Sequence, residues 1–157
     1  MTKLRKILTS CLTLGALLLV TPGVYGDSHK AAEKSLYDRL GGLAPIAVVV
    51  NDFIDLMVPD AELNKNPAIA EARKHVPAPY LKYQVTAQVC EATGGPCKYT
   101  GRTMKASHVH LNLTEKEWAR GVVLFKQVLA KHKVPDREQK ELLAIFDSTK
   151  ADIVMGK

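Results

Sequence analysis

Apolar side chains recur every three or four residues along most of this chain, a spacing that predicts helices with one buried face. The first clear stripe predicts a helix over residues 46–58. Its apolar members are Ile46, Val49, Val50, Phe53, Ile54 and Met57. The second stripe predicts a helix over residues 80–92. Its apolar members are Leu81, Val85, Val89 and Ala92, with Gln84 and Gln88 alongside.

Local start and stop signals place the remaining elements. Short helices are expected over residues 30–40, 68–75 and 104–108, the first ended by a glycine pair. Thr114 followed by Glu117 is a capping box, which predicts a helix over residues 115–132. Asp136 with Gln139 repeats that signal before a last long helix that runs to Val154. The pattern therefore predicts one small all-α domain.

Residues 1–26 have the pattern of an export signal. Lys3, Arg5 and Lys6 give a positive start, an apolar run covers residues 7–20, and small residues follow at the cleavage site. The apolar run is short for a membrane span. We therefore expect residues 1–26 to be removed, leaving no membrane anchor, and the domain of residues 27–157 to be exported to the periplasm.

The charge balance excludes one class of partner. The chain has 22 basic and 16 acidic residues, and part of that excess lies in the predicted signal. No stripe of arginine and lysine runs along any predicted helix, so nucleic-acid binding has no support.

A glycine-rich turn from Gly94 to Gly101 leads into a short segment that ends at His108. Imidazole is largely neutral near pH 7, so it can ligate a metal or haem iron without first losing a proton. A lone histidine is weak evidence, and a surface position would explain it equally well. The surrounding residues decide between these interpretations.

The chain resembles the truncated haemoglobin family, group I, over residues 35–154. The matching pieces are residues 35–42, 48–53, 94–101 and 104–108, together with Val134-Pro135 before the last helix. The resemblance implies a shortened globin, in which two helix pairs sandwich one haem b, with His108 as the proximal iron ligand. His110 is the nearest rival. It follows after about 200° of helical rotation, so we expect only one of the two histidines to face the iron.

The other side of the implied haem departs from the family. A tyrosine usually follows the phenylalanine of the second helix, and here Ile54 follows Phe53 without a hydrogen-bond donor. Gln84 and Gln88 could supply that donor, as could Tyr80 or Tyr83, although glutamines more often lie on a solvated face. The expected cofactor-binding residues are His108, Phe53, Ile54, Leu81, Gln84, Val85 and Gln88. Phe53 could line the pocket, belong to the core, or do both.

Cys90 and Cys97 remain after the predicted processing. An exported protein meets oxidants, so a disulfide is possible, and two separate thiols are an equal alternative. Their spacing does not fit a CxxC redox motif, and without a CxxCH motif any haem is expected to be unattached.

Three functions remain open. The first is a haem protein that binds a diatomic gas such as oxygen or nitric oxide. The second is a haem redox enzyme (a nitric oxide dioxygenase or a peroxidase-like enzyme) served by an unknown electron donor. The third is a haem-free helical interaction module. His108 argues against the third, and the lack of a histidine on residues 80–92 weighs against peroxidase chemistry.

Overall fold

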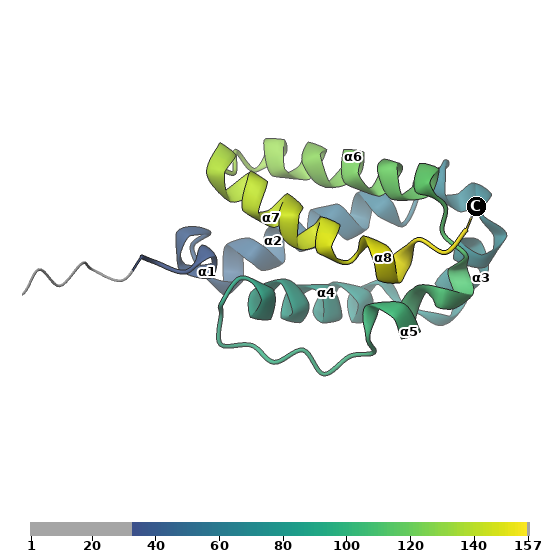
Figure 1. The fold of residues 1–157 in the computed structure, drawn as a ribbon, viewed down its shortest axis with the longest axis horizontal. Helices are drawn as coiled ribbons and strands as arrows, with labels where there is room; N and C mark the ends of the chain where they lie inside the picture. The colour runs from purple at the N-terminus through teal and green to yellow at the C-terminus, as the bar shows by residue number, and fades with distance from the viewer. Residues whose placement is uncertain (1–32, 157) are drawn as a thin grey trace, which may run out of the picture. The chain divides into compact units, whose positions relative to one another are not determined.

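The computed structural model describes residues 33–156, so the predicted export signal lies outside the described residues. The described part is helical (Figure 1). Its elements are α1 (Leu36–Arg39), α2 (Leu43–Met57), the 3₁₀ turn η1 (Leu63–Lys65), α3 (Pro67–His75), α4 (Ala78–Ala92), α5 (Met104–His108), the 3₁₀ turn η2 (Val109–Leu111), α6 (Glu115–Lys131), α7 (Asp136–Ser148) and α8 (Lys150–Ile153).

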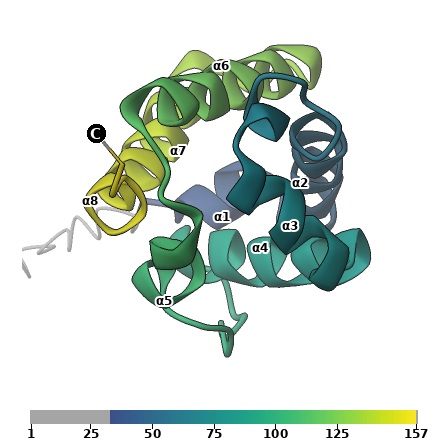
Figure 2. The ribbon, with the colours of Figure 1, turned by 90° about the vertical axis from the view of Figure 1, so that its right-hand side faces the viewer.

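The helices pack as two pairs around one core. α2 packs against both α4 and α6, α6 against α7, and the short α5 against α8. Figure 2 shows α6 and α7 along one side of the fold, with α2 and α4 across from them. The expected all-α fold with two helices over two is confirmed.

Local signals in the sequence predicted several helix ends correctly. Thr114 Oγ1 accepts a hydrogen bond from the backbone N–H of Glu117, and Glu117 Oε2 accepts one from the Thr114 N–H at 2.7 Å. The predicted capping box at the start of α6 is therefore confirmed. α2 begins at Leu43, slightly before the predicted residue 46, because Pro45 suits the first helical turn.

The prediction for the last helix was wrong. The last helix is not continuous, because α7 ends at Ser148 and α8 at Ile153. Beyond α8 the chain turns extended, and the N–H groups of Met155 and Gly156 donate to the carbonyl oxygen of Leu113. The backbone of this segment thus pairs with the start of α6 rather than continuing a helix.

The second capping signal was also misread. Asp136 is the first helical residue of α7, and the residue before it, Pro135, has no side-chain cap. The Gln139 side chain instead donates to the carbonyl oxygen of Val134 at 2.7 Å. At the other end of the chain, α1 is shorter than the helix predicted over residues 30–40, because Ser35 caps it and accepts from the Asp38 N–H at 3.1 Å.

The core between the helix pairs contains an aromatic cluster. Phe53 of α2 lies 5.3 Å from Phe125 of α6, measured between ring centroids, and Phe146 of α7 lies 4.7 Å from Trp118. Next to this cluster Ile54 is fully buried. Burying side chains of this size stabilises a fold by roughly 1.5–3 kcal/mol each, so the cluster holds α2 against α6 and α7.

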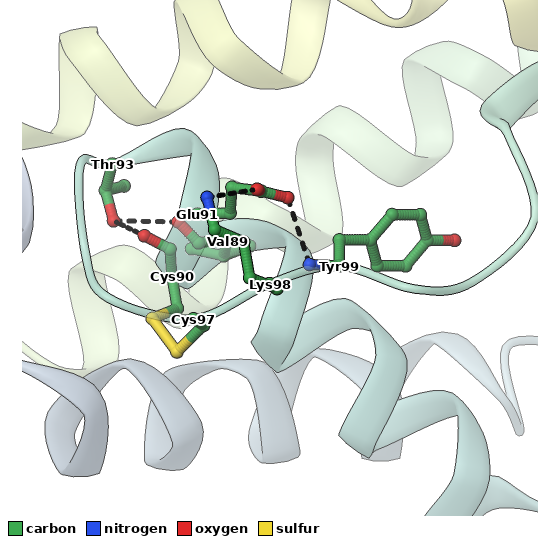
Figure 3. Close-up of a disulfide and its surroundings, with 7 residues drawn as sticks. All are labelled: Val89, Cys90, Glu91, Thr93, Cys97, Lys98 and Tyr99. Atoms are coloured by element: carbon green, nitrogen blue, oxygen red, sulfur yellow. Dashed lines mark hydrogen bonds and ion pairs between the residues drawn. A yellow bond between two sulfur atoms is a disulfide. The ribbon is translucent and has the colours of Figure 1, made fainter.

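A disulfide joins Cys90, in the last turn of α4, to Cys97 in the loop that follows (Figure 3). The pairing that the sequence left open is thus decided by the fold. Gly94 ends α4 with a positive φ of 85°, a conformation that glycine adopts without strain. Beyond the disulfide, Glu91 accepts a hydrogen bond from the Tyr99 N–H at 3.0 Å. The loop is therefore fixed along α4.

Among residues 33–156, none of the helices combines the length and the apolar character that a membrane crossing requires.

Candidate functional site

His108 is the last residue of α5, a helix capped by Thr103, whose hydroxyl accepts from the Ala106 N–H at 3.1 Å. Its imidazole is partly buried, and Nδ1 donates to the carbonyl oxygen of Met104 at 2.8 Å. Burial chiefly lowers the pKa of His108, and the neighbouring His110 adds to the effect. A lowered pKa favours the neutral ring, and none of the residues that the structure describes forms a hydrogen bond with Nε2, which can therefore take a ligand bond.

His108 lines a cavity of about 530 Å³, bounded by the end of α2, η1, α3, α4, α5, η2 and the loop after α4. The size is that of a small-molecule or cofactor site. Much of the wall is apolar. The aliphatic lining includes Met57, Val58, Leu63, Ile69, Leu81, Val85, Met104, Leu111 and Leu113. Two other cavities in the described part of the chain do not include His108.

The cavity brings together most of the expected site residues. Leu81, Gln84, Val85 and Gln88 of α4 all line it together with His108 of α5. Their roles toward a cofactor remain predictions.

Phe53 and Ile54 were expected in the same wall and do not line this cavity. Phe53 packs against Phe125 of α6, and Ile54 is fully buried in the core. This face of α2 is used for packing on the partner helices. One turn later, Met57 and Val58 take the wall position that was expected for Phe53 and Ile54.

The nearest rival to His108 lies at the same cavity, and which of the two histidines faces the iron stays a prediction. His110, although exposed, also lines the cavity. The chain leaves the α-helix at His108, whose φ is −120°, and continues as the 3₁₀ turn η2. A rotation of 100° per residue therefore does not apply between the two histidines.

Polar groups from the loop after α4 were missed by the sequence analysis. Tyr99 lines the cavity, and its hydroxyl donates to the carbonyl oxygen of Arg102 at 2.6 Å. The loop has no helical period that could have marked Tyr99 as inward-facing. The disulfide and the hydrogen bond from the Tyr99 N–H to Glu91 hold this part of the loop along α4. Tyr80 also lines the cavity, whereas Tyr83 does not and is 65% exposed.

Gln84 has one side-chain atom that requires a partner. Its Oε1 is buried and accepts no hydrogen bond from any of the residues that the structure describes. A buried amide oxygen without a donor costs about 1–3 kcal/mol, so this atom marks a place where a bound molecule or a water would be stabilised.

Residues 35–155 match the family model described as "Bacterial-like globin". The chain belongs to this family. Globins hold haem iron through a proximal histidine, so the haem cofactor expected from the sequence is the cofactor of the family. Assignment to group I within the truncated haemoglobins remains a prediction.

Solved truncated haemoglobins have the same fold. The protein of Tetrahymena pyriformis, in its Fe(III) form, is 22% identical, with a TM-score of 0.67, and the match covers 79% of this chain and 100% of that one. The 2/2 haemoglobin of Synechococcus sp. PCC 7002, described in the cyanomet state with covalently attached haem, is also 22% identical, with a TM-score of 0.68. That match covers 77% of this chain and 98% of the other. At this identity, the likeness shows the fold alone.

Proposed function

We propose that this globin binds haem b in the cavity with His108 Nε2 as the iron ligand, and that a diatomic gas, oxygen or nitric oxide, binds on the opposite face of the haem. One observation carries the proposal. His108 Nδ1 donates to the Met104 carbonyl oxygen, the arrangement by which metal-bound histidines are usually oriented and made more basic. The remaining nitrogen belongs to a side chain in the wall of an apolar cavity.

The residues present fit the group. A planar apolar macrocycle needs an aliphatic wall, which α3, α4 and η2 provide through Ile69, Leu81, Val85 and Leu111. Iron in haem supplies the position at which a small gas binds. The protein contributes the histidine, the exclusion of water, and the polar groups that face the gas.

Gln84 and Gln88 are the proposed polar groups on the gas side. Both come from α4, a different helix of the cavity wall from α5, and Ile54 offers no donor from α2. Two solved variants of the Tetrahymena pyriformis haemoglobin replace glutamines by glutamate at positions four apart, the spacing of Gln84 and Gln88. One amide hydrogen bond contributes about 0.5–1.5 kcal/mol, so the expected stabilisation of a bound gas is modest.

Haem titration tests the proposed ligand. The wild-type protein should bind one haem and develop a Soret band, and His108→Gly should weaken both. Added imidazole should restore the spectrum of His108→Gly, because the free base can take the place of the lost side chain. His75→Ala is the matched control, since His75 is 73% exposed and does not line the cavity. If His110→Ala loses the band and His108→Gly keeps it, the ligand assignment is refuted.

A second measurement separates a gas carrier from a reactive haem. Oxygen and then nitric oxide are added to the reduced protein, and the absorption spectrum is followed with time. A spectrum that is stable over hours favours reversible gas binding. Rapid oxidation after nitric oxide reaches the oxygenated protein favours the redox alternative.

We further propose that residues 1–26 direct export and are removed in the periplasm. The Cys90–Cys97 disulfide supports this, because disulfides persist in oxidising compartments. Cell fractionation followed by N-terminal sequencing of the recovered protein tests it. An uncleaved protein in the cytoplasmic fraction would contradict export.

A further inference from the structure

Arg73 of α3 brings a positive charge to the cavity that His108 lines. The guanidinium is partly buried, and its two described hydrogen bonds go to neutral acceptors. Nη2 donates to the Met57 carbonyl oxygen at 2.7 Å, and Nη1 donates to the Asn64 side-chain oxygen. Neither acceptor carries a formal charge, and the Met57 carbonyl at the C-terminus of α2 offers only the partial negative charge of a helix end.

Acidic side chains compensate this charge only at longer range. Among residues 33–156, Arg73 forms no ion pair within 4 Å with any carboxylate. The nearby carboxylate of Asp60 accepts two hydrogen bonds from Arg120, at 3.0 and 2.7 Å. Burial is the main cause that lowers the pKa of Arg73, and Asp60 opposes this only at longer range.

A partly buried cation without a counter-charge is only partly compensated, because neutral acceptors replace some of its lost hydration but do not neutralise it. The remaining unfavourable energy is relieved when an anionic group enters the cavity. A guanidinium presents a planar fork of donors, which matches a carboxylate better than it matches a neutral gas. The expected occupant is therefore the carboxylate of a bound molecule.

We propose that Arg73 is the counter-ion of a propionate of the bound cofactor, so that α3 anchors the acidic edge of the haem while α5 supplies the iron ligand. This inference rests on the proposed function, because haem b is the molecule that brings carboxylates into this cavity. Arg102 is the rival cation of the cavity lining, but it is exposed and its guanidinium donates to the Ala106 carbonyl oxygen.

The test compares haem with its dimethyl ester, in which both propionate charges are removed. The rate at which each compound is lost to an excess of a haem-scavenging apoprotein is measured. The loss rate of the ester divided by the loss rate of haem gives the preference ratio of each protein for haem. The wild type should hold haem longer than the ester. Arg73→Gln should reduce that ratio by about tenfold or more, whereas Arg73→Lys, which keeps the charge, should retain most of it.

Lys74→Gln is the matched control, because Lys74 neighbours Arg73 on α3, is 69% exposed and does not line the cavity. Circular dichroism and thermal unfolding of the haem-free variants verify the fold independently of haem. If Arg73→Gln does not fold, the wild type and Arg102→Gln decide the assignment. A wild-type ratio well above one that Arg102→Gln keeps supports Arg73, whereas a wild-type ratio near one, or a ratio lost in Arg102→Gln, overturns the inference.

The outcomes separate this inference from the proposed function. A wild type that binds neither compound refutes the proposed function itself. Tight binding of both compounds, with an Arg73→Gln ratio equal to that of Lys74→Gln, refutes the role of Arg73 and leaves haem binding intact. A ratio lost in Arg102→Gln and kept in Arg73→Gln assigns the propionate to Arg102 and also overturns the inference.

Discussion

Gly101 approaches Gln84 so closely that a Cβ atom at residue 101 would lie 2.7 Å from Gln84 Oε1. The same atom would lie 2.5 Å from the Tyr99 hydroxyl. The loop after α4 therefore lies directly against two polar side chains of the cavity. Because both contacts are with the ends of side chains, a methyl group at residue 101 would displace the polar groups more than the backbone.

Gly101→Ala should therefore alter the cavity more than the stability of the fold. In the haem-loaded protein with carbon monoxide bound, we expect a shifted C–O stretching frequency, because Gln84 and Tyr99 must move. Gly95→Ala should cost more stability, about 1–3 kcal/mol, since its Cβ would meet the Cys90 backbone oxygen at 2.8 Å.

Gly121→Ala is the control for both variants. The added methyl on α6 would meet Phe146 at 3.8 Å, an ordinary contact. Infrared spectra and thermal unfolding compare the three proteins. A Gly101→Ala spectrum identical to that of Gly121→Ala would contradict the inferred contact.

Reduction of the Cys90–Cys97 disulfide should release the loop that carries Tyr99. A bridge that closes so short a loop stabilises a fold by about 2 kcal/mol in the chain-entropy account. Dithiothreitol should therefore lower the melting temperature of the wild type and increase amide hydrogen exchange in the loop after α4. Cys97→Ser should melt at the lower temperature with or without the reductant. If the reduced and oxidised wild type melt at the same temperature, the disulfide does not stabilise the fold through this loop.

Phe53→Ala tests whether this residue belongs to the core or to the cofactor site. Its ring contacts Phe125 and Phe146 and does not line the cavity. We expect the free energy of unfolding to fall by about 3–5 kcal/mol, while the Soret spectrum of the folded protein stays unchanged. Chemical denaturation and absorption spectroscopy measure the two quantities. An altered Soret spectrum in a variant of native stability would show that Phe53 belongs to the cofactor site rather than to the core.

The contacts of Asp52 predict that the stability of the fold depends on pH in the acidic range. Hydrogen bonds from Lys131 at 2.8 Å and His132 at 2.6 Å lower the pKa of Asp52 from 3.8 to about 2. A lowered pKa in the folded state means that the carboxylate stabilises the fold above its ordinary pKa, and that this stabilisation is lost as the pH falls toward 2. The contact joins α2 to the end of α6.

Asp52→Asn should therefore melt below the haem-free wild type from neutral pH down to about pH 4, and the difference should shrink between about pH 4 and pH 2. Asp147→Asn, which removes an exposed carboxylate elsewhere, is the control. A difference in melting temperature that is the same at pH 2 and pH 7 would show that the contact is not electrostatic.

Short-range signals in the sequence were enough for most of the helices. The stripes over residues 46–58 and 80–92, the capping box at Thr114 and the segment that ends at His108 all correspond to observed elements. They were predictable because an apolar stripe and a cap depend on residues a few positions apart. The last helix was predicted incorrectly because its end depends on pairing with Leu113, far away in the chain.

The sequence by itself determined the helical class, the glycine-rich turn and the candidate ligand His108, since each is encoded in a short run of residues. Only the tertiary structure decided that Cys90 meets Cys97, that Phe53 lies in the core, and that Arg73 and Tyr99 face the cavity. These relations join segments distant in the chain. They are set by how the helices pack, which no local spacing specifies.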